Sequence, residues 1–485
     1  ANKKRKKKIE RADQELTDSP PVHVAQLKEE GRFNDGILDV FGSLYKQLNF
    51  DSLITSTKQN DKWNKTLEAC VLARLAQPTS KKKSTSILED NFNISLDLDH
   101  VYRMMDHVNR LERRIKECVA QQTQSLFKSK VDVLLFDVST LYFESTERDT
   151  LKEFGFSKDC KFNQTQVVLA LMTTTQGTPM GYELFPGNTS EGKTLVTVIE
   201  QIKERFELNQ VVLVADRAMF NRDNLEKMDE LKVKYVVAAK LRSLNKDLKN
   251  QILNSCTYKA DMVKDELHWI NQFELNPNQR LIVSYSSLRA RKDQADRGRI
   301  LLKLNKKTKD GKLKVSDIVS NQGSKKFVNF GKSKAELDQE KIANDAQWDG
   351  LHGVITNVKD ESCKQLLARY RDLWKIEEAF RFNKHDLKLR PIYHWKPERI
   401  KAHIAICYIA FALLSYSRVK LRENNFIISF EKMREELLKA QSSLVRDTKS
   451  GTLFSIPSKA TELQKSIYKA FGLRRTQTAI MLPMN

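Results

Sequence analysis

The sequence has few cysteines, and their arrangement argues against two kinds of stabilised small domain. Six cysteines are scattered over 485 residues without one CxxC pair. Disulfide frameworks and zinc sites depend on closely spaced cysteines, so neither is expected, and free thiols fit a reducing compartment. No signal peptide and no 18-residue apolar run is found, and the apolar residues near 400–415 are too few and too charged at their flanks. We therefore expect no membrane partner.

Three other features are missing from the sequence. No glycine-rich phosphate loop follows any predicted strand, which argues against a Rossmann or P-loop nucleotide site. No internal repeat divides the chain. The aromatic motif of RNA-recognition domains is missing as well, so an RNA-binding or structural role has no support beyond high charge.

What the sequence does contain is a large excess of positive charge. Lysine and arginine number 84 against 62 acidic residues, a net charge of +22, and hydrophobic residues make up 40%, enough for a core. The length predicts two to four domains. Nucleic acid is the first candidate partner, because lysine and arginine contacts to phosphates release counterions. An anionic membrane surface, without a long basic amphipathic anchor, and a basic but ordinary enzyme are the alternatives.

The N-terminal quarter is predicted to be helical. Residues 1–20 open with ANKKRKKKIER and predict a disordered basic arm, either solubilising or phosphate-binding. Residues 21–128 carry apolar side chains at three- and four-residue steps, as in TLEACVLARLAQ. We interpret them as a helical N-terminal DNA-binding region, with a purely structural bundle as the alternative.

From residue 131 the apolar residues form continuous runs. VDVLLFDVST, QTQVVLALMTTTQG and TPMGYELFPGN predict three strands, followed by a helix at 190–206, a strand in QVVLVADRA, a second helix and a strand in KVKYVVAAKL. The order β-β-β-α-β-α-β resembles the ribonuclease H fold and not a Rossmann unit. We therefore predict an α/β, ribonuclease H-like mixed-sheet core at 129–244 and 350–395.

A long segment interrupts this core. Residues 245–349 contain two strand patterns, RLIVSYSS and SKKFVNFG, and a highly charged stretch that predicts a helix running into a loop. We predict a β-rich insertion domain, with a separate domain as the alternative. Residues 396–485 are predicted to be a helical C-terminal region, whose apolar helix RIKAHIAICYIAFALLSYSRVK buries one side against the core.

Two acidic residues stand where predicted buried strands end. Asp137 follows VLLF and Asp216 follows VVLVA. Burying a carboxylate without a partner is costly, and a hydrogen-bonded structural aspartate would explain each of them alone. On adjacent strands their like charges would repel unless a cation lay between them. Mg²⁺ or Mn²⁺ suits such a site, because hard cations prefer carboxylate oxygens.

A third carboxylate is predicted from a later helix. The stretch YRDLWKIEEAFRFNK, from Tyr370 to Lys384, places aromatic, acidic and basic side chains on one helical stripe. Three carboxylates could hold two ions about 4 Å apart, the arrangement used in phosphoryl transfer. Glu377 is preferred over Glu378, which points about 100° away around the helix, because Glu377 shares the stripe.

These residues carry a resemblance to a known family. The chain resembles insertion-sequence DDE transposases whose third acid lies in a Y-x2-R-x3-E-x6-K signature. Tyr370, Glu377 and Lys384 match in register, whereas Leu373 stands where the arginine is expected, a place that Arg371 or Arg381 could fill. FDVSTLYFE, VADRAMF and LKLRPIYHWKPERIKAHI also resemble family blocks. The resemblance covers roughly residues 35–475 and implies Glu377 as the third acid.

The resemblance implies a DNA transposase that cuts the ends of an insertion element and joins the 3′-OH ends to target DNA. Asp137, Asp216 and Glu377 would be the catalytic residues and would hold two Mg²⁺ (or Mn²⁺) ions. A hairpin on the element end is possible in this group. The partner would be double-stranded DNA, bound by a homodimer on paired ends. The protein would be cytoplasmic, in a bacterium, and associated with the nucleoid through DNA.

Five further residues are expected to contact DNA. The resemblance implies that Arg217 and Lys384 contact phosphate, with Arg381 as a further cation beside them. Tyr370 would hold a phosphate or stack. Trp348 would support a flipped base, or would anchor the insertion as a buried side chain.

Other functions remain open at this point. A ribonuclease H-like, metal-dependent nuclease could cut DNA without joining it. A non-enzymatic DNA-binding protein derived from a transposase is the other alternative, against which three intact carboxylates argue. We interpret His394 and His403 as packing or hydrogen-bonding side chains.

Overall fold

The chain divides into two compact units. The terminal unit combines Ala1–Val119 with Phe382–Asn485, and the central unit is Ala120–Arg381. The structure is a computed structural model that describes residues 22–55, 60–127, 133–156, 163–190, 192–195, 197–199, 212–216, 222–309, 324–330 and 335–482. The predicted basic arm at 1–20 and the end of the predicted helix at 190–206 lie outside the described residues.

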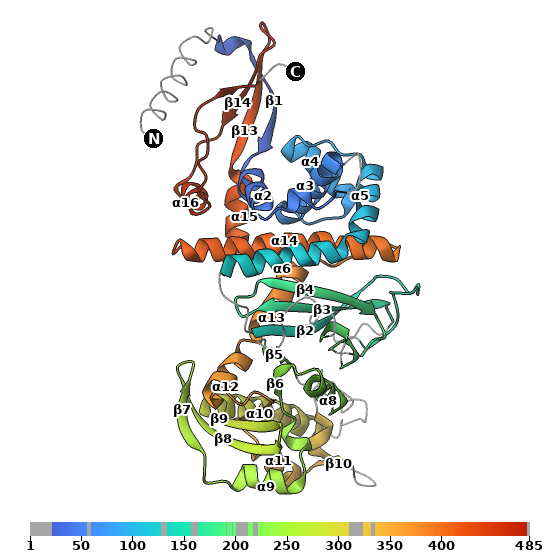
Figure 1. Ribbon diagram of the computed structural model, residues 1–485, viewed down its shortest axis with the longest axis vertical. Helices are drawn as coiled ribbons and strands as arrows, with labels where there is room; N and C mark the ends of the chain where they lie inside the picture. Colours follow the sequence, from blue (N-terminus) through green and yellow to red (C-terminus); the bar gives the residue numbers. More distant parts are fainter. Residues whose placement is uncertain are drawn as a thin grey trace. The chain divides into compact units, whose positions relative to one another are not determined.

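The central unit is built on one mixed nine-stranded sheet (Figure 1). The strand order across the sheet is β4-β3-β2-β5-β6-β12-β9-β8-β7. In chain order the strands are β2 (Val133–Tyr142), β3 (Gln166–Thr174), β4 (Pro179–Pro186), β5 (Val212–Ala215), β6 (Lys234–Ala238), β7 (Lys259–Val263), β8 (Glu266–Asn276), β9 (Gln279–Ser286) and β12 (Leu351–Thr356).

The first five strands confirm the predicted order of strands. β2, β3 and β4 form an antiparallel meander, and β5 and β6 run parallel to β2. Every residue of β3 and β5 is buried, as their continuous apolar runs require. On one face, alternate residues of β2 and β5 pack against helical residues in 192–195 and 197–199 and against α8 (Arg222–Glu230). The predicted second helix corresponds to α8.

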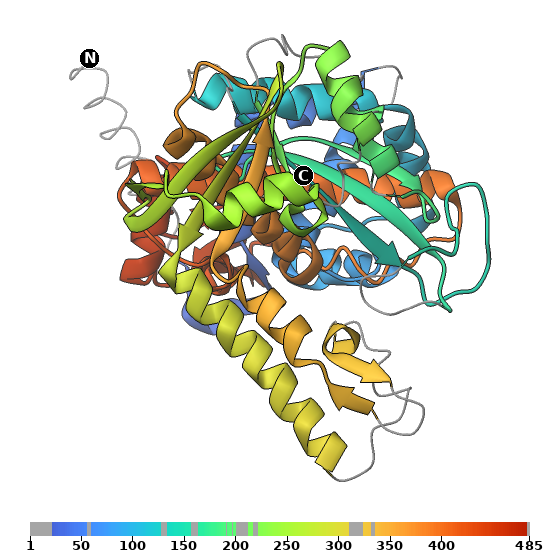
Figure 2. The same ribbon diagram turned by 90° about the horizontal axis from the view of Figure 1, so that it is seen from below.

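The strands of the insertion continue the core sheet. β9 pairs with β12, and β8 and β7 follow outward, so these strands do not form a sheet of their own. Beyond β9, α10 (Ser287–Lys309) packs with the hairpin β10 (Val328–Phe330) and β11 (Ala335–Leu337) and with α11 (Gln339–Ala346) around a small apolar cluster. Figure 2 shows α10 beside this hairpin. A further helix, α9 (Lys246–Asn254), follows β6.

The prediction of a single helix from Tyr370 to Lys384 is wrong. The segment forms α12 (Cys363–Arg371), α13 (Trp374–Arg381) and a π-helical turn, η9 (Phe382–Asp386). Arg371 is bonded to Glu266 and to the carbonyl oxygen of Val263, and Asp372 is paired with Lys264. The β7–β8 hairpin therefore holds the end of α12, where the Leu373 N–H closes a three-residue turn onto Tyr370.

The terminal unit contains a helical bundle. Its long helix α14 (Pro397–Glu423) packs against α3 (Asn60–Ala76) and α5 (Leu98–Arg110). The other helices are α2 (Ser43–Gln47), α3 (Asn60–Ala76), α4 (Lys81–Phe92), α5 (Leu98–Arg110), α15 (Phe430–Lys439) and α16 (Glu462–Ala470), while α6 (Glu112–Phe127) crosses the boundary between the units. Shorter turns are η1 (Val24–Gln26), η2 (Leu38–Gly42) and η3 (Phe50–Ser52), with η6 (Leu241–Ser243) and η8 (Ser324–Phe327) in the central unit.

The sequence predicted that both terminal regions are helical. This prediction is wrong in part, because the terminal unit also contains a sheet. A four-stranded sheet combines β1 (Leu27–Asn34), β13 (Gln441–Asp447), β14 (Leu453–Pro457) and β15 (Ile480–Met481). β1 pairs antiparallel with β13, so segments from the two ends of the chain form one sheet. These strands are short and mostly half-exposed, so they lack the apolar pattern from which strands are predicted.

The expectation of no membrane-length apolar segment needs a correction. α14 is long and apolar enough to cross a membrane by length and composition, but 89% of its most apolar window is buried inside the protein. A core helix that is apolar on all sides has the same composition as a spanning helix. The burial of α14 assigns it to the core of the terminal unit.

Candidate functional site

Asp137 and Asp216 lie level with each other on neighbouring strands. β2 and β5 pair in parallel up to Phe136 and Ala215, the residues just before the two acids. Both carboxylates are half-buried. The backbone N–H of Val138 donates to Oδ1 of Asp137 at 2.7 Å. Asp216 directly follows the end of β5, as predicted, whereas the prediction that Asp137 stands at a strand end is wrong, because β2 continues through it to Tyr142.

The two aspartates project from the same face of the sheet. Phe136 and Ala215 belong to the apolar cluster on one face, and alternation along a strand turns the next residue to the opposite face. α13 contacts β2 and β3, and α12 contacts β5 and β6. The described buried side chains of these two helices are absent from that cluster, which indicates that they cover the face bearing the acids.

Glu377 lies in the first turn of α13, the helix packed on the strand of Asp137. Its side chain is exposed and makes no hydrogen bond or ion pair to a described residue. Glu378 is half-buried and pairs with Arg381 at 3.7 Å. Because α12 and α13 are separate helices, the continuous stripe that favoured Glu377 does not exist. The difference in exposure and pairing distinguishes the two glutamates instead.

A cleft of about 910 Å³ brings Asp216 together with two of the predicted DNA contacts, Trp348 and Tyr370. The ring of Tyr370 lies 4.9 Å from that of His352, which also lines the cleft. Trp348 packs in part against the cluster around Leu241 and also faces the cleft. The two interpretations of Trp348, as an anchor and as a binding side chain, are therefore compatible.

The cleft wall carries cations that sequence reasoning missed. The side chain of Lys240 is exposed and makes no hydrogen bond or ion pair to a described residue. Among the described residues, the guanidinium of Arg289 is paired with Asp293 alone, at 3.9 Å. Lys240 comes two residues after the end of β6, the strand that pairs in parallel with β5. The rule that selected Asp137 and Asp216, a polar residue after a buried parallel strand, could also have selected Lys240.

Other charged residues of the cleft hold one another in place. Arg297 is bonded to Asp349 and lies 3.6 Å from Asp345, and both Arg242 and Lys326 are bonded to Asp345. Hydrogen bonding to Asp349 raises the pKa of Arg297. Burial would raise the pKa of Asp345, but the hydrogen bonds from Lys326 and Arg242 outweigh it and lower that pKa. This network fixes the turn that carries Trp348.

The remaining predicted DNA contacts are distributed differently. Arg217 lies outside the described residues. Arg381 ends α13 with its ion pair to Glu378, and Lys384 lies in η9, which belongs to the terminal unit. Leu373, at the arginine position of the signature, is 8% exposed and packs as an apolar residue. Arg371 is already bonded to the β7–β8 hairpin.

The donor set of the two aspartates suits a divalent metal ion. Two level, half-buried carboxylates offer hard oxygen ligands and repel each other unless a cation joins them. Among the residues that the structure describes, however, no group of three or more His, Cys, Asp and Glu side chains is gathered closely enough to hold a metal. The third carboxylate is thus not assembled with the pair.

Comparison with known proteins gives one match over most of the central unit. The family described as transposase DDE domain matches residues 128–413, more than half of the chain and including Asp137, Asp216 and Glu377. No curated protein matches. Among solved structures, the chain is similar to a piggyBac transposase synaptic complex with hairpin DNA, at 10% identity and a TM-score of 0.40, over 84% of this chain and 77% of that one.

Proposed function

Because the chain belongs to the transposase DDE domain family, we propose that it cuts the ends of an insertion element and joins the 3′-OH ends to target DNA. The observation that carries the proposal is the level placement of Asp137 and Asp216 on one face of β2 and β5. The order β4-β3-β2-β5-β6 within the mixed sheet supports the ribonuclease H-like core that we propose. We assign the chain to the group with the Y-x2-R-x3-E-x6-K signature, with Leu373 as its departure.

The three acidic residues are proposed to act together once DNA is bound. Asp137 and Asp216 offer two ligands from the sheet, and Glu377 is exposed and unengaged on the helix that packs on β2. DDE transposases generally use divalent metal ions, and two Mg²⁺ or Mn²⁺ ions held by these carboxylates would activate the attacking oxygen and stabilise the leaving one. The carboxylates keep this arrangement in both the cleavage and the joining step.

The cleft beside Asp216 is proposed to hold the DNA strand that reacts. Lys240 and Arg289 offer positive charge to its phosphates, and Tyr370 offers a hydroxyl and a ring. Trp348, fixed from behind by packing, is suited to stack on an unpaired base. Arg217, Arg381 and Lys384 are proposed as further phosphate contacts. We further propose that the protein is cytoplasmic in a bacterium and works as a homodimer on paired DNA ends.

An assay with element-end DNA tests this function. The wild-type chain should cut uncut ends and join pre-cut ends to a target in Mg²⁺ or Mn²⁺. Asp137→Asn and Asp216→Asn should each lower both rates by roughly 10²–10³-fold or more, the scale of losing one main electrostatic stabiliser. Binding of end DNA in EDTA should stay largely intact.

A matched control is Asp247→Asn, which removes an exposed aspartate from the first turn of α9, away from the cleft lining. It should leave both rates unchanged. Cleavage without joining under any metal would identify a nuclease instead of a transposase. Activity that survives Asp137→Asn would refute a catalytic role for these carboxylates.

A further inference from the structure

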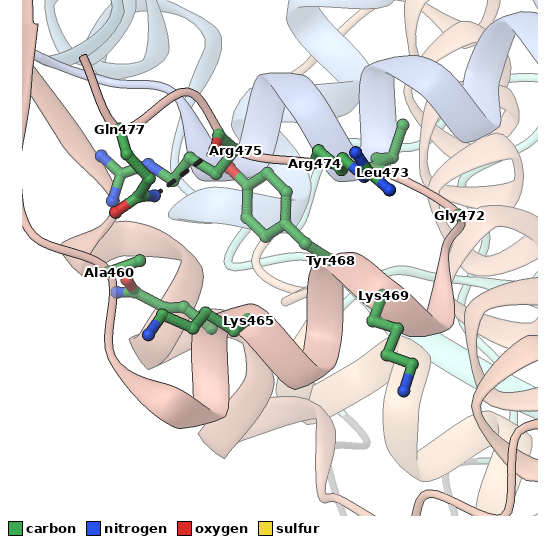
Figure 3. A pocket seen from close by; sticks show the side chains of 10 residues that line it. Ala460, Lys465, Tyr468, Lys469, Gly472, Leu473, Arg474, Arg475 and Gln477 are labelled. Carbon is green, nitrogen blue, oxygen red and sulfur yellow. Dashed lines mark hydrogen bonds between the residues drawn. The ribbon is translucent and has the colours of Figure 1, made fainter. Parts of the chain in front are cut away.

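The terminal unit contains a second pocket, of about 520 Å³, beside the C-terminal half of α16 (Figure 3). Figure 3 shows Lys465 and Lys469 on this helix and Arg474 and Arg475 on the segment after it. These four cations line the pocket together with Ala460, Gln464, Tyr468, Gly472, Leu473 and Gln477, and no acidic residue is among the lining residues. The lining is therefore strongly electropositive.

Two of these cations are available to a ligand. Lys469 and Arg474 are exposed and make no side-chain hydrogen bond or ion pair to a described residue. Lys465 is paired only with Glu462, whose side chain is 89% exposed, and an exposed pair of this kind contributes little. Each of Lys469, Arg474 and Lys465 could thus take up an anionic group without breaking a buried contact.

The fourth cation is held rigidly in the wall. The side chain of Arg475 is 5% exposed, and it donates to the carbonyl oxygens of Ser458 and Gln441 at 2.9 and 2.6 Å. Its Nε is buried without a hydrogen-bond partner among the described residues. Asp35 lies 3.6 Å away and offsets only part of the charge. Arg475 therefore contributes a fixed positive charge to the lining.

The end of α16 is arranged so that it does not repel an anion strongly. The last carbonyl groups of a helix normally form a negative pole. Here the N–H groups of Phe471, Gly472 and Leu473 donate to the carbonyls of Ile467, Lys469 and Tyr468. Gly472 makes this turn possible with a φ of +70°, a backbone conformation that favours glycine. The exposed acceptors at the helix end are thereby used within the chain.

The chemistry of the lining favours phosphate over a base. Tyr468 is buried, and its hydroxyl donates to Asp39 at 2.7 Å, so this ring is not free to stack on a base. Lysine and arginine side chains recognise phosphate oxygens without reading sequence. We propose that this pocket binds phosphate groups of the DNA backbone and gives the terminal unit an affinity for DNA that does not depend on base sequence. The inference rests on the proposed function in that DNA is taken as the partner.

The test compares two double variants of the full chain in EDTA, where no cleavage occurs. Lys469→Ala with Arg474→Ala removes the two unengaged cations of the pocket. Lys359→Ala with Arg422→Ala removes two exposed cations that line neither described cavity. Binding of a fluorescein-labelled DNA duplex of arbitrary sequence is measured by anisotropy over a range of salt concentrations, and thermal unfolding checks that each variant is folded.

The pocket variant should bind the duplex roughly tenfold or more weakly, and its plot of log affinity against log salt should be shallower by about one to two, since each phosphate contact contributes about 0.9 to that slope. The control pair should keep the wild-type slope. As a second variant, Arg474→Glu alone should weaken binding more than Arg474→Ala.

Three results would overturn the proposal. An unchanged slope in the pocket variant means that DNA does not use the pocket. Equal losses in both double variants mean that only net charge matters. Calorimetry with inorganic phosphate or pyrophosphate separates the sources: binding that the pocket variant loses, with DNA affinity intact, identifies a site for a free phosphate compound. If the wild type itself fails to bind DNA, the proposed function fails, which is a distinct outcome.

Discussion

Glu377 and Glu378 are neighbours in sequence with different surroundings. Glu377 is exposed at the start of α13 and is not engaged with a described residue. Glu378 is half-buried and paired with Arg381. A carboxylate that must take up a metal ion needs to be free of a competing cation, so the pairing favours Glu377 as the third acid.

We expect Glu377→Gln to abolish cleavage and Glu378→Gln to lower it only slightly. The first change removes a proposed metal-binding carboxylate. The second removes an ion pair to Arg381, whose side chain is largely exposed, and such a pair is worth about 1 kcal/mol or less. Rates of end cleavage in Mg²⁺ and in Mn²⁺ measure the difference. Equal loss from the two changes would mean that the assignment of Glu377 is wrong.

Leu373 shows how one residue can depart from a family signature and still fit its structure. The side chain is 8% exposed at the junction of α12 and α13. An arginine at the same place would have to leave its charge buried or rearrange the junction. The neighbouring cations Arg371 and Arg381 are already paired, with the β7–β8 hairpin and with Glu378. The exposed Lys240 lines the same cleft as Asp216 and is not paired with a described acid.

At the scale of elements, α14 and the segment before it contain two buried histidines. His403 lies on α14, 5.4 Å between ring centroids from His394. Burial, with Lys81, Arg399 and Arg74 nearby, lowers the pKa of His394 to about 3. Burial, together with Arg74 on α3 and Lys81 on α4, also lowers the pKa of His403 well below its usual value. These are packing histidines, as the sequence suggested.

The stability of the protein should fall as the pH is lowered from 6.5. Above pH 6.5 the histidines are neutral in both the folded and the unfolded chain, so no penalty arises. Between pH 6.5 and the lowered pKa of the folded protein, only the unfolded chain takes up these protons. The free energy of unfolding therefore falls by about 1.4 kcal/mol per pH unit for each such histidine. Urea unfolding at pH 7, 6 and 5 measures this slope.

His394→Asn should reduce the slope by about one proton, whereas His385→Asn, at an exposed position of η9, should leave it unchanged. A slope that His394→Asn does not alter would show that other groups cause the loss of stability at acidic pH.

The break between α12 and α13 is set by contacts with strands of the central unit. α12 begins at a capping box formed by Ser362 and Gln365, and ends where the β7–β8 hairpin holds Arg371. α13 then begins at Trp374 and packs on β2. Contacts from a distant hairpin therefore decide where a helix breaks, although its local sequence is compatible with continuous helix.

For the whole molecule, the net charge of +22 is the property most directly linked to function. Binding of end DNA should weaken linearly on a plot of log affinity against log salt, because phosphate contacts release counterions. Filter binding or anisotropy from about 50 to 300 mM salt measures the slope. The same experiment with a duplex of unrelated sequence gives the non-specific part, and an affinity that salt does not change would contradict the electrostatic picture.

The amino-acid sequence alone determined the strand order of the core and the candidate acids. Continuous apolar runs can be read locally, and a polar residue directly after such a run is conspicuous, as with Asp137 and Asp216. The resemblance to DDE transposases agrees with the family match over residues 128–413, whereas the signature of Tyr370, Glu377 and Lys384 stays a prediction. These features depend on the chemistry of neighbouring residues and therefore survive without a structure.

Only the tertiary structure decided how distant segments combine. It showed that the insertion strands continue the core sheet, that β1 pairs with β13, and that the helix near Leu373 breaks. It also placed Lys240 in the same cleft as Asp216, and Arg475 in the same pocket as Lys469. The physical reason is that strand pairing, ion pairs and pockets join residues far apart in the chain, and their energies do not appear in any local pattern of residues.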